Sequence, residues 1–265
     1  MALSRYLYKE GAVAALPWKT ELIDRVLRIL TVRQFQTLFF TLLNVNGFGW
    51  TSIDSEVRSF SAFLRKKEIS EGFVLDIGAS YGAWTKRFLL EEHSFQVVLF
   101  EPSSTPYEKI CQDFAGNHNV SIKQLALGAT SGARHLCSDE PGSGSASIVN
   151  RSFDNHQFCE AVKTMPLISV VQQYTDVVAI KLDCEGAEWE ILSNFRLSKS
   201  KIQLIQFEFG EYMVENQIFF KDYYDYFLKN GFDLFRNTKR GPVKINQYNK
   251  WDEILVNCVY FAIRR

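Results

Sequence analysis

One turn, in the stretch FVLDIGASYGAWTKR at residues 73–87, constrains the fold of this chain more than any other feature. The apolar run before it is typical of a strand buried on both faces, and residues 81–90 have the apolar spacing of a helix. Gly78 and Gly82 flank the bend. A glycine-rich turn from strand to helix leaves backbone N–H groups unpaired and lets a ligand approach the main chain. The pattern therefore predicts a nucleotide-type site here.

Two of the three interpretations of this turn meet difficulties. The dinucleotide fingerprint G-x-G-x-x-G is not met, because residues 76–82 have the order D-I-G-A-S-Y-G, which disfavours NAD. Residues 78–82 do match the G-x-S-x-G of a hydrolase nucleophile elbow. A hydrolase triad, however, normally has its histidine late in the chain, and all four histidines lie before residue 157.

The third interpretation is the first motif of class I methyltransferases, D-x-G-x-x-x-G, which the turn resembles. Asp76 stands two residues before the first glycine. S-adenosylmethionine carries a sulfonium and an amino-acid tail instead of a pyrophosphate, which would explain an acid at this place. The structural alternative is that Asp76 only caps a tight turn.

Composition and charge narrow the class of protein. A chain of 265 residues that is 46% hydrophobic can bury one sizeable core. Lysine plus arginine equals aspartate plus glutamate, at 30 each, so no overall basic field indicates a nucleic-acid partner. Five cysteines without a C-x-x-C pair fit free thiols in a reducing compartment. The N-terminal residues lack the apolar core of a signal peptide, and we expect a cytoplasmic protein.

The first seventy residues predict a helical extension ahead of a catalytic domain at 71–265. Residues 20–43 have one or two amphipathic stripes, which we expect to pack on the catalytic domain or to form a homodimer. A lesser alternative is peripheral contact with a membrane, since arginines flank a very apolar face. Asp54 is placed to cap a further helix with apolar residues from Val57 to Leu64.

Glu101 ends a second buried strand, at residues 97–100, nineteen residues after Gly82. A carboxylate at this place can accept hydrogen bonds from both hydroxyls of a ribose, and dinucleotide-binding folds use the same device at about this separation. We therefore predict that Glu101 binds an adenosine-type cofactor. Thr105 to Glu108 has the pattern of a capping box and predicts a second helix, to about residue 115.

Two acids follow a later strand. Residues 120–127 predict a third strand, and residues 138–150 predict a long polar loop that either covers a site or stays mobile. The run VVAIKL at 177–182 then leads into DCEGAEWE at 183–190. Asp183 and Glu185 project to one side at the carboxyl end of a strand, where open α/β sheets bind ligands. Glu188 and Glu190 are explained by the dipole of the following helix.

Four blocks in order resemble the FkbM family of S-adenosylmethionine-dependent methyltransferases: FVLDIGASYGAW, FEP at 100–102, ALG at 126–128 and IKLDCEGAEWEIL at 180–192. The resemblance covers about residue 46 to the C-terminus. It implies an α/β, Rossmann-like class I fold with a seven-stranded, mostly parallel sheet. By position it implies that Asp76, Gly78, Ala79, Ser80 and Gly82 line the cofactor's methionine end, that Glu101 binds the ribose and Ala126 faces the adenine, and that Asp183 and Glu185 face the methyl group.

The chain departs from relatives at two places, and its end fits the resemblance. Relatives often have Asn at the position of Ser80, and a Leu-Asp pair where Val170 and Val171 stand. Residues 233–235 and 255–263 predict the antiparallel hairpin that ends class I methyltransferases. Between them, residues 236–253 are basic and aromatic, which suits either an anionic sugar or a solvated loop.

The resemblance implies that members of the family O-methylate hydroxyls of sugars or of polyketide and related products. On that basis we expect an S-adenosylmethionine-dependent O-methyltransferase that acts on a hydroxyl of a sugar or glycoconjugate and releases S-adenosylhomocysteine. A polyketide, peptide or amine acceptor is the alternative. Asp183 or Glu185 is the expected base. No metal is predicted, although Asp183 with Glu185 or Glu208 would hold a divalent ion in a metal-assisted variant.

Overall fold

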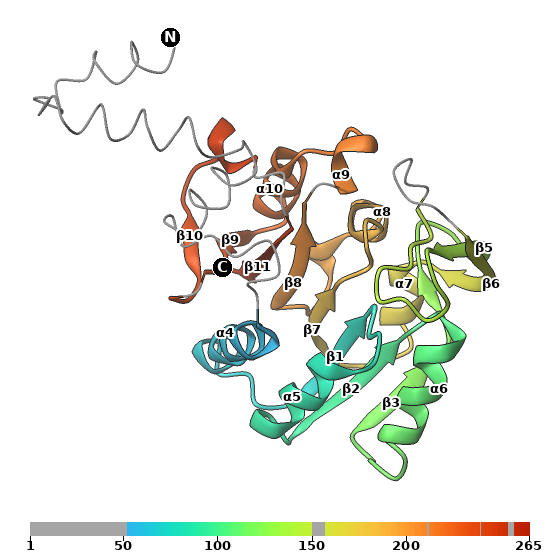
Figure 1. Ribbon diagram of the computed structural model, residues 1–265. Helices are drawn as coiled ribbons and strands as arrows, with labels where there is room; N and C mark the ends of the chain where they lie inside the picture. Colours follow the sequence, from blue (N-terminus) through green and yellow to red (C-terminus); the bar gives the residue numbers. More distant parts are fainter. Residues whose placement is uncertain (1–51, 150–156, 211, 239, 254–256) are drawn as a thin grey trace, which may run out of the picture. The chain divides into compact units, whose positions relative to one another are not determined.

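The computed structural model describes residues 52–149, 157–210, 212–238, 240–253 and 257–265 (Figure 1). The helices predicted within 20–43, with the expected dimer and membrane contacts, lie outside the described residues. The main elements are α4 Ile53–Lys66, β1 Gly72–Ile77, α5 Ala83–Glu91, β2 Phe95–Phe100, α6 Ser104–Asp113, β3 Val120–Lys123, β4 Ala126–Leu127, β5 Gly132–Ser138, β6 Phe158–Met165, α7 Leu167–Val171, β7 Val177–Leu182, α8 Glu188–Ser193, β8 Leu204–Phe209, α9 Tyr212–Glu215, α10 Phe220–Lys229, β9 Phe232–Arg236, β10 Val243–Ile245 and β11 Cys258–Arg264.

The main sheet has eight strands in the order β10-β9-β11-β8-β7-β1-β2-β3. The five strands β8, β7, β1, β2 and β3 are parallel to one another. β11 runs antiparallel between β8 and β9, and β10 pairs antiparallel with β9. This topology confirms the predicted α/β class I fold with antiparallel strands at its end. The eighth strand, β10, lies at the edge and comes from the basic stretch for which no strand was predicted.

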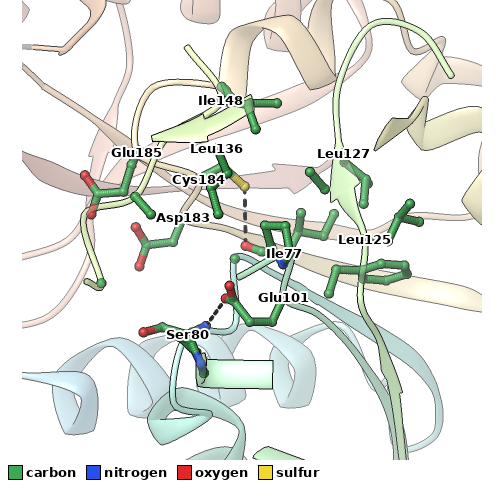
Figure 2. Close-up of a pocket in the computed structure, with 18 of the residues that line it drawn as sticks. Ile77, Ser80, Glu101, Leu125, Leu127, Leu136, Ile148, Asp183, Cys184 and Glu185 are labelled. Atoms are coloured by element: carbon green, nitrogen blue, oxygen red, sulfur yellow. Dashed lines mark hydrogen bonds between the residues drawn. The ribbon is translucent and has the colours of Figure 1, made fainter. Parts of the chain in front are cut away.

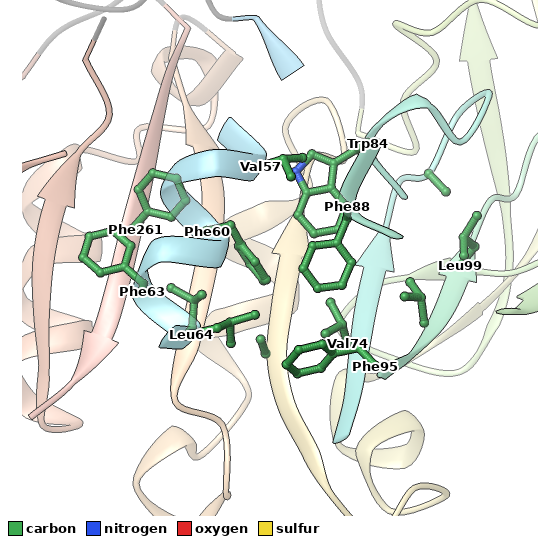
Figure 3. Close-up of a cluster of buried hydrophobic side chains, with 14 of the residues drawn as sticks. Val57, Phe60, Phe63, Leu64, Val74, Trp84, Phe88, Phe95, Leu99 and Phe261 are labelled. Atoms are coloured by element: carbon green, nitrogen blue, oxygen red, sulfur yellow. The ribbon is translucent and has the colours of Figure 1, made fainter. Parts of the chain in front are cut away.

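The core on one face of the sheet is built around α4 (Figure 3). Phe60 is fully buried and its ring lies 5.0 Å from that of Trp84 and 5.7 Å from that of Phe88. Phe63 packs 5.4 Å from Phe261 of β11. Burying a side chain of this size contributes about 1.5–3 kcal/mol. α4 therefore shares one buried cluster with β1, α5 and β11.

Local details differ from the sequence predictions at three element ends. α4 is capped by Ser52, whose hydroxyl accepts from Ser55 N, and Asp54 lies inside the helix. α6 begins at Ser104, one residue before the predicted capping box, and its N-cap Ser103 makes no side-chain cap. The strand predicted over 120–127 is divided, because β3 pairs with β2 whereas β4 leaves the main sheet and pairs with β6.

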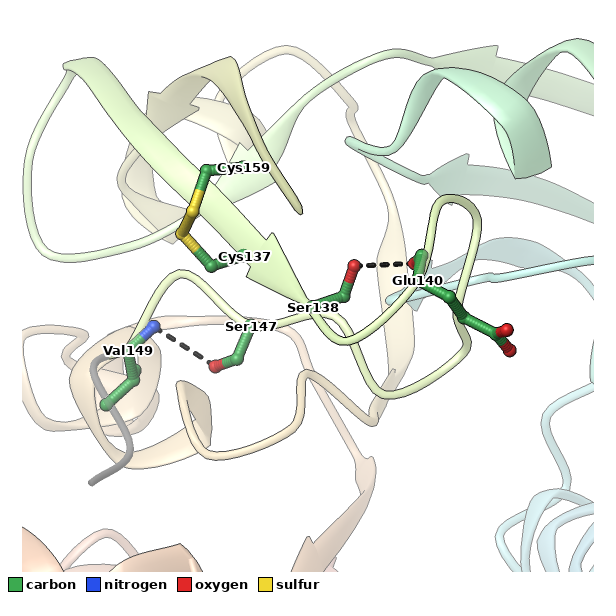
Figure 4. Close-up of a disulfide and its surroundings, with 6 residues drawn as sticks. All are labelled: Cys137, Ser138, Glu140, Ser147, Val149 and Cys159. Atoms are coloured by element: carbon green, nitrogen blue, oxygen red, sulfur yellow. Dashed lines mark hydrogen bonds between the residues drawn. A yellow bond between two sulfur atoms is a disulfide. The ribbon is translucent and has the colours of Figure 1, made fainter. Parts of the chain in front are cut away.

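A second, three-stranded sheet has the order β4-β6-β5 and holds a disulfide (Figure 4). The antiparallel register of β5 and β6 places Cys137 opposite Cys159, with their Cα atoms 4.2 Å apart, and the two are bonded. The expectation of free thiols is therefore wrong for this pair. Cysteines 22 residues apart give no sign of pairing until the strands between them are known. Disulfides persist mainly in oxidising compartments, so the cytoplasmic prediction loses one of its supports.

The helices in the described part of the chain include none that combines the length and the apolar character needed to span a bilayer.

Candidate active site

The turn between β1 and α5 is held by the end of β2. Gly78 and Ala79 both donate their N–H groups to the carbonyl of Phe100, each at 3.0 Å. The N–H of Ser80 donates to Oε2 of Glu101 at 2.7 Å. The unpaired N–H groups expected at this turn are therefore engaged, because the neighbouring parallel strand ends beside it. This turn offers no cradle of free donors of the kind that binds a pyrophosphate.

Three residues of the turn have positive φ angles, and their surroundings differ. Gly78 has φ +76°, and a Cβ there would lie 1.8 Å from the carbonyl oxygen of Asp183. Gly82 has φ +71°, but its Cβ would meet the Phe114 ring at 2.8 Å, so this glycine serves helix packing. Ser80 adopts φ +47°. Asn tolerates this left-handed conformation better than most residues, which accounts physically for Asn in relatives.

Asp76 lies beneath the turn with none of its surface exposed. Its Oδ2 accepts from the hydroxyl of Thr85 at 2.6 Å, and its Oδ1 lies 3.1 Å from Nζ of Lys181. These contacts tie β1 to α5 and to β7. In this arrangement Asp76 supports the turn from behind.

A pocket opens beside this turn at the carboxyl ends of β1, β2 and β7. Of the predicted site residues, the pocket lining contains Gly78, Ser80, Glu101, Ala126, Asp183 and Glu185, whereas Asp76, Ala79 and Gly82 lie outside it. Apolar side chains line the remainder, among them Phe100, Pro102, Pro106, Leu125, Leu127, Leu136 and Ile148.

The pocket has an apolar side and an acidic side (Figure 2). Leu125 and Leu127 lie opposite the carboxylates of Asp183 and Glu185, and Glu101 projects between the two sides. An apolar wall suits a purine, a carboxylate suits vicinal hydroxyls, and acids suit a cationic sulfur. The donor and acceptor set therefore fits an adenosine ligand that carries a sulfonium.

The loop over residues 139–149 narrows the pocket. Ser143, Gly144, Ala146 and Ile148 contribute to the lining, so of the two roles expected for this polar loop the structure shows that of covering a pocket. The Tyr81 hydroxyl donates to the Gly142 carbonyl at 2.9 Å. The free volume left inside is about 50 Å³, against about 300–1,000 Å³ for small-molecule pockets. A nucleoside therefore needs this loop, or side chains beneath it, to move aside.

Glu101 is oriented by two backbone donors. Its Oε2 accepts from Ser80 N at 2.7 Å and its Oε1 from Ser103 N at 2.8 Å, and the residue is 6% exposed. Each carboxylate oxygen keeps a second lone pair, so two hydroxyls of a ligand can still be accepted. Burial raises the pKa of Glu101 to about 7, against the lowering effect of these N–H groups.

This pKa predicts that cofactor affinity depends on pH. Ribose hydroxyls are bound by the ionised carboxylate, so we expect affinity for S-adenosylhomocysteine to fall about tenfold per pH unit below pH 7. Calorimetry between pH 5.5 and about 8.5 measures this. The Glu101→Gln variant should bind weakly with no such slope. If affinity still depends on pH in this variant, the dependence belongs to another group, such as Glu188.

The raised pKa of Glu101 also predicts how the stability of the protein without cofactor depends on pH, and this trend is opposite to that of the affinity. Glu101 has a pKa of about 7 when folded and 4.5 ordinarily, so the folded state binds more protons between these values. The free energy of unfolding should therefore fall as pH rises through this window.

Three acids lie close together, and two of them, Asp183 and Glu185, line the pocket. Asp183, Glu185 and Glu208 each offer a carboxylate oxygen within 4.8 Å of the others. Glu185 adopts φ +53°, an uncommon conformation for a side chain other than Asn, Asp or Gly. Burial, and next the charges of Asp183 and Glu185, raise the pKa of Glu208. The arrangement can accept a proton from a hydroxyl, and its ligand set also suits Mg²⁺ or Mn²⁺.

Several site residues were not predicted from the sequence. Tyr212 contacts Glu185, and burial together with that charge raises the pKa of its hydroxyl. Lys181, 3% exposed, lies between Asp76 and Asp183. A lone lysine in the apolar run VVAIKL was the available signal, since a buried charge needs a partner.

The acids assigned to the helix dipole hold turns as well. Glu188 is 1% exposed and accepts from the N–H groups of Cys184 and Gly186, at 2.5 and 3.0 Å. Burial raises its pKa to about 7. Glu190 accepts from Ala129 N at 2.8 Å. Both glutamates therefore shape the segments around the pocket, which the dipole explanation did not include.

Comparison with known proteins gives the family. A model of the methyltransferase FkbM domain matches residues 76–234, which span the turn, Glu101, the acids and β9. The chain belongs to the FkbM methyltransferase family. As a member it is an S-adenosylmethionine-dependent methyltransferase. No protein with a curated function matches this FkbM-family chain.

Solved structures resemble the FkbM-family chain only remotely. One is a precorrin-6y C5,15-methyltransferase from Geobacter metallireducens, with 10% identity, a TM-score of 0.43, and coverage of 83% of this chain and 94% of the other. Another is a fibrillarin pre-rRNA processing protein from Methanococcus jannaschii, with 11% identity, a TM-score of 0.42, and coverage of 74% and 67%.

Proposed function

We propose that this protein is an O-methyltransferase that acts on a hydroxyl of a sugar or glycoconjugate. The observation that carries the proposal is the placement of Asp183 and Glu185 in the lining of the pocket, opposite its apolar side. A hydroxyl becomes nucleophilic enough only as its proton leaves, so a carboxylate beside the acceptor is the group the reaction needs.

The chain's own residues have separate tasks in this reaction. S-adenosylmethionine supplies a methyl group on a positively charged sulfur. Glu101 holds the ribose hydroxyls, and the apolar wall around Leu125 and Leu127 excludes water from the purine side. Asp183 takes the proton of the acceptor hydroxyl. Because the leaving group is already activated, alignment and proton removal are the main contributions of the protein.

The acceptor is chosen on chemical grounds. The cluster of Asp183, Glu185 and Glu208 suits a neutral polyhydroxyl compound, whose hydroxyls donate to carboxylates. A polyketide or peptide hydroxyl, or an amine, is the alternative. A divalent ion on the same three acids would polarise the hydroxyl instead of deprotonating it directly.

Cofactor choice gives the first test. We expect the purified chain to bind S-adenosylmethionine and S-adenosylhomocysteine and to leave NAD unbound, since the turn offers few free N–H donors. Isothermal calorimetry measures all three. Glu101→Ala should weaken binding by about 1.5–3 kcal/mol, the range for charged hydrogen bonds. Binding of NAD, or equal affinity in the variant, would contradict this assignment of the pocket.

The acceptor is tested by transfer of a labelled methyl group. Methyl-labelled S-adenosylmethionine is incubated with panels of saccharides, sugar nucleotides, polyketides, peptides and amines, and products are followed by mass spectrometry. The proposal expects an alkali-stable methyl ether on a sugar hydroxyl. Transfer only to the other panels would replace the sugar with the alternative acceptor.

A further inference from the structure

We infer that Lys181 is a positioning residue that fixes the carboxylate of Asp183 against the cofactor turn. The inference rests on the proposed function, in which Asp183 takes the acceptor's proton. It assigns the orientation of the Asp183 carboxylate to a buried cation that is not among the residues lining the pocket. The evidence is its place among three oxygens that come from three separate parts of the site.

Lys181 lies in β7, a strand that is otherwise apolar, and is 3% exposed. An ammonium has three donors and no acceptor. Its Nζ donates to the carbonyl of Gly78 at 2.8 Å, lies 3.1 Å from Oδ1 of Asp76, and lies 3.5 Å from Oδ2 of Asp183. The buried ammonium therefore has one hydrogen bond to a backbone carbonyl and two carboxylates of opposite charge within 3.5 Å, as a buried charge requires.

The two carboxylates beside this ammonium differ in exposure. The side chain of Asp76 is fully buried and is also bonded to Thr85, so it has a structural role on its own. The side chain of Asp183 is 45% exposed and lines the pocket. Lys181 approaches Oδ2 of Asp183, and we assign the other oxygen, Oδ1, to the acceptor.

The cofactor turn and Asp183 are joined through their backbones as well. Asp183 N donates to the carbonyl of Ile77 at 3.1 Å, and a Cβ on Gly78 would overlap the Asp183 carbonyl. The backbone contacts therefore fix the position of the Asp183 main chain, and Lys181 fixes the position of its carboxylate. Burial alone would lower the pKa of Lys181, but the charges of Asp76 and Asp183 raise it, so the ammonium stays charged.

A simpler role for Lys181 would be to neutralise Asp76 alone. Removing only the lysine leaves a buried carboxylate without a partner and is expected to destabilise the fold strongly. The informative variant is therefore the double substitution Asp76→Asn with Lys181→Met, in which both buried charges are gone. Replacement of both members of a buried pair is usually tolerated.

The experiment compares four proteins: the parent, Asp183→Asn, the Asp76→Asn/Lys181→Met pair, and the triple variant. The first readout is the midpoint of thermal unfolding, which needs no acceptor. We expect Asp183→Asn to shift the midpoint in the parent and not in the pair background, because contacting residues are coupled and separated ones are not. The same shift in both backgrounds would overturn the inference.

Turnover gives the second readout, with the acceptor found by label transfer. We expect the pair variant to bind S-adenosylhomocysteine within about tenfold of the parent and to lose at least about tenfold in kcat. Added to Asp183→Asn, the pair should change kcat by less than about threefold. Parental kcat in the pair variant would reduce Lys181 to a partner of Asp76.

The two hypotheses fail in different ways. If the parent does not bind S-adenosylhomocysteine, or if Asp183→Asn keeps parental kcat, the proposed function of these residues is wrong. A different result would leave the proposed function intact. If Asp183→Asn lowers kcat, but the Asp76→Asn/Lys181→Met pair changes kcat by the same factor with and without Asp183→Asn, only the role of Lys181 is wrong.

Discussion

Asp183→Asn is expected to lower turnover about 10²-fold or more, within the range for loss of a general base. Affinity for S-adenosylhomocysteine should change little, because Asn keeps the shape of the side chain and removes only its charge. The side chain is 45% exposed, so the fold should be retained. Single-turnover kinetics with saturating cofactor measures the rate, and calorimetry measures the affinity.

The matched control is Asp176→Asn, just before the other end of β7. Its carboxylate pairs with exposed Lys201 at 2.5 Å and lies away from the pocket, so turnover should stay at the parental level. If chelation abolishes activity and Mg²⁺ or Mn²⁺ restores it, Asp183 is a metal ligand. Parental turnover in both Asp183→Asn and Glu185→Gln would move the search for a base to Glu208.

The sequence predicted the central elements of the fold because their patterns are local. β1, β2 and β7 are short apolar runs, and each of them ends at the same edge of the sheet because parallel strands share their direction. The second sheet was not predicted. β4 has only two residues, and the pairing of β5 with β6 depends on contacts that no local pattern records.

The same limit explains which site residues were found. Glu101, Asp183 and Glu185 directly follow strands or stand beside glycine, where acids are hard to explain by packing. Lys181 was missed because its meaning depends on Asp76, which is distant in sequence and adjacent across β1 and β7. Gly82 was predicted as part of the turn, but what excludes a Cβ at this position is the ring of Phe114, which is distant in sequence.

Gly78→Ala is expected to cost about 4 kcal/mol or more of unfolding free energy, a size that only a few mechanisms reach. Two causes combine at this position. The new Cβ would lie 1.8 Å from the Asp183 carbonyl oxygen, an overlap with backbone that no rotamer can relieve. The residue also has φ +76°, which is unfavourable for any residue with a Cβ. Urea denaturation measures the loss.

Gly116→Ala separates these two causes. Gly116 has φ +79°, almost the same angle as Gly78, but nothing lies within 4 Å of the place its Cβ would take. This control should therefore lose only about 1–2 kcal/mol, the cost of the left-handed conformation. The difference between the variants measures the contact between the cofactor turn and Asp183. Equal losses in both would show that Gly78 is needed for its φ angle alone, and that the turn and the acid are not pressed together as the structure has them.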